Sequence, residues 1–133
     1  LAADVTDVIN PEPLGVGGIW RSIQITGLAR AHHAELALHN AESPLKTMIA
    51  LQICAVTPNI FIQECFDDFL EPWTADVLQG YLRVEDGHLK MPAAPGLGVE
   101  LNEEEAAKHP YSPKHFLRMF RPGWERRDVA LRE

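Results

Sequence analysis

Three short apolar runs of this chain end in ionisable residues that recur at a nearly constant spacing. The runs end at Glu12, His39 and Glu64, which lie 27 and 25 positions apart. This is the period of a strand, helix and strand repeat. The C-terminal ends of neighbouring parallel strands meet on one rim, where (β/α) barrels and open α/β sheets bind their substrates. The spacing therefore predicts a rim that carries an acid, an imidazole and a second acid.

The part of the chain up to residue 66 is predicted to alternate between strands and helices. We predict strands at Val5–Pro11, Glu35–His39 and Asn59–Glu64, and helices over Ile19–His33 and from the N-cap pair Ser43-Pro44 to Val56. The second helix is apolar almost all around, and the third strand has nearly no polar face. Such elements are typical of a parallel sheet covered on both faces. The predicted fold class is therefore α/β.

The rest of the chain has a different, loop-rich character. We predict, in chain order, a short helical turn at Asp76–Gly80, a hairpin of Tyr81–Val84 with Gly87–Met91, and a capped helix at Glu103–Lys108. From His109 onward the sequence is loop-like. The acidic residues Asp67, Asp68 and Glu71 have neighbours typical of a solvated surface, so we do not expect them to bind a metal.

Three parallel strands and two helices leave open sheet edges, and one edge belongs to an almost wholly apolar strand. Such strands need neighbours on both sides. We therefore expect the chain to be the last part of a larger barrel, whose other strands lie upstream or in a separate chain. The chain begins at Leu1 rather than at a methionine, which favours a processed or truncated product, although the design of an expression clone would have the same effect.

Composition and charge exclude several classes of protein. The chain has 46% hydrophobic and 23% charged residues, as is typical of a soluble globular protein. Its net charge of -7 argues against a nucleic-acid partner, because phosphates bind clustered Lys and Arg. No segment has the apolar length of a membrane span or the pattern of a signal peptide. Cys54 and Cys65 lack the spacing of a metal or redox motif, so we predict reduced thiols and a cytoplasmic location.

The strand ends also carry motifs of a known family. They are Asn10-Pro11-Glu12 with the pair Gly17-Gly18, then Leu38-His39, and then Phe61-Ile62-Gln63-Glu64. In this order they resemble the sixth, seventh and eighth barrel strands of the enolase superfamily, and among its branches the mandelate racemase branch. Within that branch, three motifs are similar to sugar-acid dehydratases of the galactonate and mannonate type: Ile62-Gln63-Glu64, Val84–Gly87 and Pro95–Glu100. The segment Ala106–Tyr111 strengthens the similarity to the mannonate type.

The resemblance implies a fold and a reaction. It implies the last three strands of a (β/α)7β TIM-like barrel in residues 1–66, and in residues 67–133 an extension that packs on the barrel and returns to a capping domain. The reaction is the magnesium-dependent dehydration of a sugar acid: a proton beside the carboxylate is removed, an enediolate forms and water is lost. The family's magnesium ligands come from upstream strands, outside this chain. The implied partners are a sugar-acid substrate, the remainder of the barrel and, in a homo-oligomer, further copies of the protein.

The resemblance also implies roles for the three rim residues. His39 matches the histidine that acts as general base or acid. Glu12 occupies the place of the aspartate that orients this histidine, and its extra methylene is a departure that puts the Glu12–His39 dyad in question. Glu64 corresponds to the glutamate that hydrogen-bonds the substrate carboxylate. Such a buried carboxyl can keep its proton and donate to a developing oxyanion.

Several alternatives remain open at this stage. The same fold supports a racemase, an epimerase or a cycloisomerase, and a catalytically incomplete fragment would only associate with the rest of its barrel. If these residues have no role in the reaction, Glu12 is a solvated turn residue, and His39 and Glu64 are structural polar residues at strand ends. The glycines Gly15, Gly17 and Gly18 lack the dinucleotide-binding spacing. They favour a tight turn or the approach of a substrate carboxylate to a helix N-terminus.

Overall fold

The computed structural model describes residues 1–3 and 5–113 of the chain. Contacts divide the chain into two compact units, Leu1–Asn102 and a second unit that begins at Glu103. The predicted loop from His109 onward is described only as far as Pro113, and the rest of that prediction lies outside the described residues.

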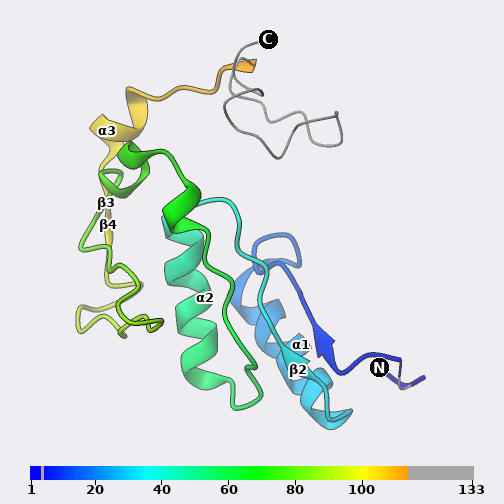
Figure 1. Ribbon diagram of the computed structural model, residues 1–133. Helices are drawn as coiled ribbons and strands as arrows, with labels where there is room; N and C mark the ends of the chain where they lie inside the picture. The colour runs from blue at the N-terminus through cyan, green and yellow to red at the C-terminus, as the bar shows by residue number, and fades with distance from the viewer. Residues whose placement is uncertain (4, 114–133) are drawn as a thin grey trace. The chain divides into compact units, whose positions relative to one another are not determined.

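Three segments of the first unit run parallel to one another (Figure 1). Strand β1, Val8–Ile9, pairs with strand β2, Glu35–Leu36. On its other side Leu36 forms a parallel bridge with Ile60. The predicted parallel order is therefore confirmed, but the regular strands are shorter than predicted.

Side-chain amides continue the pairing where the regular backbone ladder stops. Asn59 Nδ2 donates to the Ala34 carbonyl at 2.8 Å, and Gln63 Nε2 donates to the Leu38 carbonyl at 3.1 Å. Asn10 Nδ2 likewise donates to the Ala37 carbonyl. These amides satisfy backbone acceptors that a longer strand would satisfy itself.

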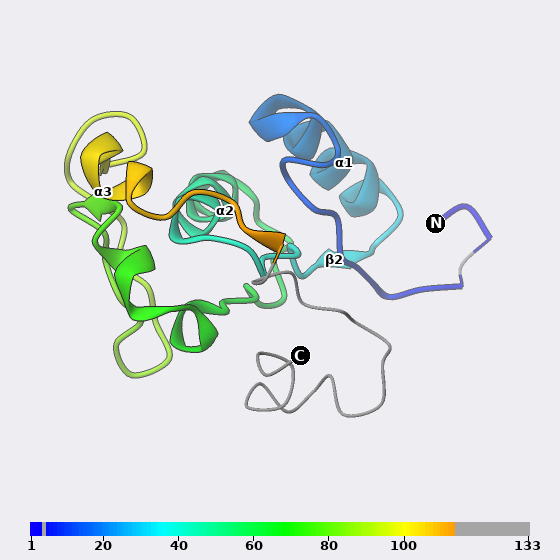
Figure 2. The same ribbon diagram turned by 90° about the horizontal axis from the view of Figure 1, so that it is seen from above.

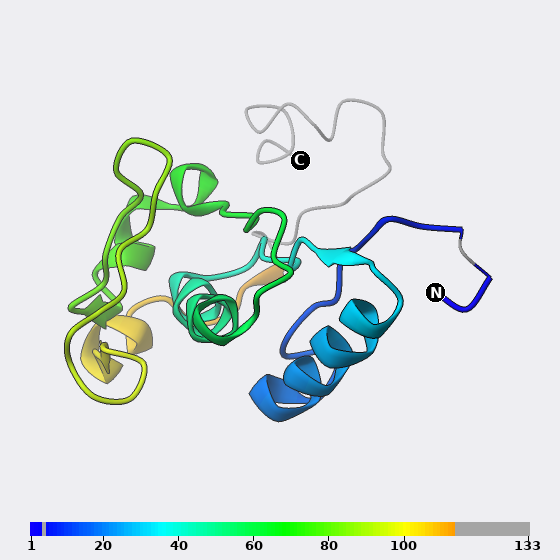
Figure 3. The ribbon, with the colours of Figure 1, turned by 90° about the horizontal axis from the view of Figure 1, so that it is seen from below.

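Two helices follow the first two strands. Helix α1, Gly18–Ala31, starts after Gly17, whose φ of 108° lies in the left-handed region that favours glycine. Helix α2, Pro44–Val56, starts after Ser43, whose side chain accepts from the Lys46 N–H at 3.3 Å, as the N-cap prediction requires. Helix α1 packs against both β2 and α2 (Figure 2 and Figure 3). Among the described residues, no helix is long and apolar enough to cross a membrane.

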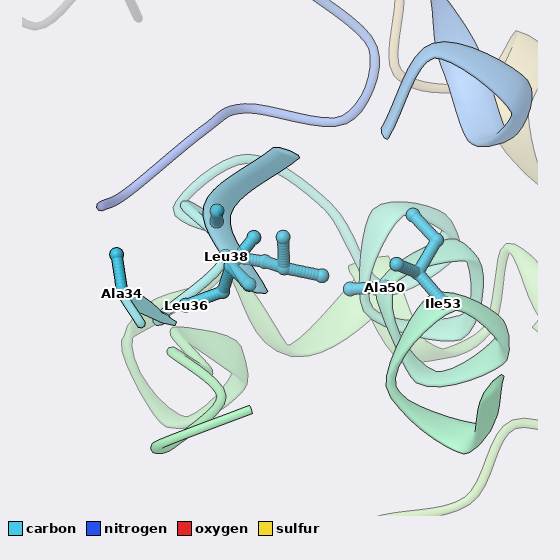
Figure 4. Packing of buried hydrophobic residues seen from close by; sticks show 6 residues of the cluster. Ala34, Leu36, Leu38, Ala50 and Ile53 are labelled. Atoms are coloured by element: carbon cyan, nitrogen blue, oxygen red, sulfur yellow. The ribbon is translucent and has the colours of Figure 1, made fainter. Parts of the chain in front are cut away.

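The core lies where α1, β2 and α2 meet. Figure 4 shows Leu38 pointing toward Ala50 on α2. The fully or almost fully buried residues of this core are Ala29, Ala34, Leu36, Leu38, Ala50 and Ile53. Leu36 combines a side chain without exposure with backbone pairing on both sides, so it is the centre of the strand layer.

The outer edges of the strand layer are apolar and exposed. Val5 is 78% exposed on one side, and Phe61 and Ile62 are 64% and 60% exposed on the other. Within residues 1–3 and 5–113, β1 pairs only with β2, and the bridge of Ile60 joins it only to Leu36. Apolar unpaired edges of this kind are a site for further strands.

The prediction of a helical turn at Asp76–Gly80 was wrong. Strand β3, Leu78–Gln79, lies there and pairs antiparallel with strand β4, Glu100–Leu101. The short helical turn, η2, lies just before it at Pro72–Ala75, and a second 3₁₀ turn, η1, covers Asp67–Phe69. Strand β3 depends on a partner more than 20 residues away in sequence, so local pattern alone did not predict it.

The predicted hairpin is reduced to its turn. Glu85 and His88 form an antiparallel bridge across Asp86 and Gly87, which have φ angles of 50° and 75°. Two positive φ angles at these positions are typical of the tight turn that joins hairpin strands. In the second unit, helix α3 covers Glu103–Ala107, one residue shorter than predicted.

Both cysteines of the chain are thiols, as predicted. Burial raises the pKa of the Cys54 thiol to about 11, so this thiol is protonated at neutral pH. Cys54 is therefore a packing residue of α2 rather than a nucleophile.

We predict that Leu36→Ala lowers the free energy of unfolding of the complete protein by about 3 kcal/mol, because it opens a cavity at the centre of the strand layer. Denaturant unfolding followed by circular dichroism measures this change. The matched control is Leu28→Ala on α1, where the side chain is 56% exposed and the cost should be much smaller. Equal losses in the two variants would contradict the assignment of the core.

Candidate functional site

The structure brings two of the three predicted rim residues into direct contact. His39 Nδ1 lies 2.7 Å from Glu64 Oε2. His39 follows β2, and Glu64 follows the segment that bridges to β2. Their side chains are 39% and 34% exposed, so the pair is open to solvent on one side. The parallel arrangement of the strands thus places an imidazole and a carboxylate at one end of the layer.

Asn40 fixes the position of the Glu64 carboxylate. Its backbone N–H donates to Glu64 Oε2 at 2.7 Å, and its Nδ2 donates to the Glu64 carbonyl at 3.1 Å. Asn40 Nδ2 also donates to Thr47 Oγ1 at 2.8 Å, and Thr47 Oγ1 donates to Asp67 Oδ1 at 3.1 Å. Asn40 and Thr47 are both almost fully buried. Sequence reasoning missed both residues, although Asn40 directly follows the predicted histidine.

One side-chain atom of His39 and one of Glu64 remain available to a ligand. Among the described residues, His39 is bonded through Nδ1 only, and the Glu64 side chain is bonded through Oε2 only. His39 Nε2 and Glu64 Oε1 therefore have capacity for one more hydrogen bond each. This arrangement can exchange a proton at Nε2 while the carboxylate binds a donor at Oε1.

The local interactions favour the ionised form of Glu64. Burial on its own would raise the pKa of Glu64, but the Asn40 N–H, the His39 hydrogen bond and the nearby Lys46 charge together lower it below 4.5. An ionised Glu64 accepts hydrogen bonds. Donation from Glu64 to a substrate oxyanion, considered from the sequence, requires the protonated form instead.

Glu12 has a different set of partners from the one that the resemblance implies. Its carboxylate accepts from the N–H groups of Leu14, at 2.9 Å, and Gly15, and it lies 2.8 Å from Lys46 Nζ. Among the described residues it has no hydrogen bond to His39. A Cβ atom at Gly15 would lie 2.5 Å from Glu12 Oε2, so the glycine leaves room for this carboxylate. The glycine cluster thus forms a tight turn, one of the two predicted roles.

Lys46 is a buried cation that the sequence analysis did not single out. Its side chain has no exposed surface, and Nζ lies 2.8 Å from Glu12 Oε1 and 3.3 Å from Glu42 Oε2. Neither contact has the angle of a well-directed hydrogen bond, so the attraction is mainly ionic. Burial on its own would raise the pKa of Glu12, but Lys46 and the two backbone N–H groups outweigh it and lower this pKa.

The described residues do not fit a magnesium site by themselves. No group of three or more His, Cys, Asp or Glu side chains among residues 1–3 and 5–113 is arranged to hold a metal ion. A hard cation needs about six oxygen ligands, so the rim pair alone is insufficient.

A cavity of about 340 Å³ lies on the other side of the polar network. Pro44, Asp67 and Tyr81 are among its lining residues, whereas Glu12, His39 and Glu64 are not. The hydrogen bonds of Thr47, Asn40 and Glu64 join Asp67, on the cavity wall, to the rim. The open face of the His39–Glu64 pair, and not this cavity, is therefore the candidate site.

A parallel α/β layer whose strand ends bring an acid and an imidazole together is an arrangement in which functional groups meet at one rim. A family model described as enolase C-terminal domain-like matches residues 1–106. The chain belongs to this family.

Known proteins similar to the chain include a dehydratase and two solved structures. D-gluconate dehydratase of Thermoproteus tenax is 31% identical over 124 residues, which cover 93% of this chain and 25% of that relative. An enolase from Pantoea ananatis with bound D-gluconate and magnesium is 27% identical with a TM-score of 0.73, covering 80% of this chain and 26% of that one.

The other structure, from Burkholderia xenovorans strain LB400, is assigned as an L-alanine-DL-glutamate epimerase and is bound to magnesium and fumarate. It is 30% identical with a TM-score of 0.78, and the match covers 84% of this chain and 27% of that one. The chain spans only about a quarter to a third of the length of the curated relatives that it matches.

We predict that Glu12→Gln lowers the free energy of unfolding by about 2 kcal/mol, because it leaves the Lys46 ammonium buried without its nearest countercharge. This is less than the roughly 3 to 5 kcal/mol of a fully buried pair, since Glu12 is 25% exposed and Glu42 remains nearby. The matched control is Glu85→Gln, whose 2.7 Å pair with Lys90 is 67% and 75% exposed and contributes little. Denaturant unfolding at neutral pH compares the two, and similar losses would contradict the burial argument.

We also predict that the stabilisation from the Glu64 carboxylate disappears in acid. The pKa of Glu64 is lower in the folded protein than in the unfolded chain, where it is near 4.5. The ionised carboxylate therefore stabilises the fold at pH values above 4.5, and this contribution is lost as the pH falls through the pKa of the folded protein. Gln resembles the protonated carboxyl in shape. The free energies of unfolding of the wild type and Glu64→Gln should therefore differ near pH 7 and converge below pH 4.5. A difference independent of pH would count against an ionised Glu64.

Proposed function

We propose that this chain forms part of a magnesium-dependent sugar-acid dehydratase, to which it contributes His39 and Glu64. The observation that carries the proposal is the His39–Glu64 contact at the strand ends, which leaves Nε2 and Oε1 available. Similarity to a D-gluconate dehydratase and to a structure with bound D-gluconate supports a sugar acid as the substrate class.

In the proposed reaction, His39 Nε2 removes the proton on the carbon beside the substrate carboxylate. The C–H electron pair forms the double bond of an enediolate, and Glu64 Oε1 accepts a hydrogen bond from a hydroxyl group of the bound sugar acid. The neighbouring C–O bond then breaks, and its oxygen leaves as water after it is protonated. The enol product takes up a proton at carbon and loses its hydroxyl proton to the solvent, which gives a 2-keto acid. His39, as imidazolium, is the acid available to the leaving hydroxyl.

Magnesium belongs to the proposal but not to the described residues. Two of the similar structures contain it, and the site described above lacks a cluster of ligands. When bound, the metal would stabilise the negative charge that develops on the substrate carboxylate. Its ligands are expected on strands outside this chain.

The barrel placement is also a proposal. We assign the three parallel segments to the sixth, seventh and eighth strands of a (β/α)7β barrel in residues 1–66, and residues 67–133 to an extension that packs on the barrel and a capping domain. The exposed apolar edges at Val5, Phe61 and Ile62 support neighbouring strands from the remainder of the barrel. A cytoplasmic homo-oligomer remains a prediction.

A racemase or epimerase is the second candidate. The observation that favours it is the similarity to the structure assigned as an L-alanine-DL-glutamate epimerase. Both reactions begin with removal of the proton beside a carboxylate, so the described half of the site serves either one. Incubation of the complete protein with D-gluconate in deuterated water separates them: a 2-keto acid supports the dehydratase, and deuterium-labelled epimer without loss of water supports the epimerase.

We predict that His39→Asn in the complete protein abolishes dehydration of D-gluconate while the acid still binds in the presence of magnesium. Asn retains polarity but cannot accept the proton at working pH. A 2-keto acid assay and isothermal titration calorimetry measure the two effects. The matched control is His32→Asn, at the exposed C-terminal end of α1, which should turn over normally. Unchanged turnover in His39→Asn would overturn the assignment of His39.

A further inference from the structure

We propose that Glu64, rather than Glu12, holds the Nδ1 proton of His39, and that Lys46 is the positioning residue that keeps Glu12 away from the imidazole. The inference rests on the proposed role of His39 as the proton-transfer group. It assigns a function to Lys46 and a second function to Glu64, beyond contact with the substrate.

The Glu64 carboxylate is arranged to orient the imidazole. Oε2 lies 2.7 Å from His39 Nδ1 and accepts from the Asn40 backbone N–H, also at 2.7 Å. The second donor is part of the backbone and cannot rotate away, so it fixes Oε2 beside the ring. With Nδ1–H donating to Oε2, Nε2 carries the lone pair, and the histidine has the tautomer that a base at Nε2 requires.

The Glu12 carboxylate is fully committed to other donors. Oε1 lies beside Lys46 Nζ and the Leu14 N–H, and Oε2 accepts from Gly15 N–H. Rotation of this carboxylate toward His39 would break these contacts and leave the fully buried Lys46 ammonium with only Glu42, which is 62% exposed and 3.3 Å away. An ammonium without a close countercharge is costly to bury. Lys46 therefore holds Glu12 in the turn that precedes α1.

The two oxygens of the Glu64 carboxylate have different roles, and this couples the orientation of the base to substrate binding. Glu64 Oε2 serves the imidazole, and Oε1 has no hydrogen bond among the described residues. One carboxylate thus sets the tautomer of the base and contacts the acid on which the base acts. Glu12 has one methylene more than the aspartate that the resemblance implies at this position. This longer side chain is compatible with the arrangement because the Glu12 carboxylate is not needed at the imidazole.

The test is nitrogen NMR of the complete protein labelled with ¹⁵N-histidine, at about pH 8, where an ordinary imidazole is neutral. The His39 signals are assigned by their loss in His39→Asn. We expect the wild type to show the Nδ1–H tautomer. Glu64→Met removes the acceptor and should shift the population toward the Nε2–H tautomer that prevails in free histidine side chains.

Variants at the buried pair test the role of Lys46. Lys46→Met/Glu12→Gln removes both charges, so no unpaired ion is buried, and it should keep the wild-type tautomer. Lys46→Met alone releases Glu12 and should shift the His39 signals. Lys46→Arg keeps the positive charge and should leave these signals as they are in the wild type. If Lys46→Met does not fold, Lys46→Gln takes its place, and the double variant still tests whether the imidazole needs Glu12.

Three outcomes would overturn the inference: an unchanged tautomer in Glu64→Met, a changed tautomer in Lys46→Met/Glu12→Gln, or unchanged His39 signals in Lys46→Met. The second would restore Glu12 as the partner of His39. The measurement does not depend on turnover. An inactive protein with the expected tautomers would refute the proposed dehydration and leave the assignment of Glu64 and Lys46 intact.

Discussion

Hydrogen bonding on both sides of residues 35–39 is the constraint on which the rest of the first unit depends. The N–H groups of Glu35, Ala37 and His39 donate to one neighbouring segment, ending at the Pro11 carbonyl at 3.0 Å, while Leu36 pairs with the other segment through Asn59 and Phe61. This alternation fixes the register of all three segments. The functional side chains therefore occupy positions set by the backbone, and His39 meets Glu64 because their segments are in register.

The buried charge of Lys46 then decides which acid His39 meets. Two carboxylates, Glu12 and Glu64, follow the segments on either side of the histidine. A lysine without exposed surface attracts one of them, and the backbone N–H groups of the glycine-rich turn hold the same carboxylate. The other carboxylate is bound by the Asn40 N–H beside the imidazole. Burial and local donors, rather than sequence position, select the pair.

The features that the sequence predicted correctly depend on local pattern. The order of strands and helices follows from the apolar runs and their spacing, and the start of α2 follows from Ser43 and Pro44, whose capping contact spans three residues. Strand β3 was missed because its partner Glu100–Leu101 is distant in sequence. Lys46 was missed because a helix that is apolar all around gives no sign of which polar residue faces inward. Its burial depends on Glu12, 34 positions earlier.

The exposed edges of the strand layer limit what these residues do on their own. Val5, Phe61 and Ile62 expose large apolar side chains at edges that lack further strands among the described residues. In the proposed barrel, strands that cover these edges would run parallel to β1 and β2 and bring their own C-terminal ends to the rim of His39 and Glu64. The burial of the apolar edges and the arrival of further acidic ligands would then result from the same closure. Metal binding and folding stability should accordingly be coupled in the complete protein, because both depend on the same neighbouring strands.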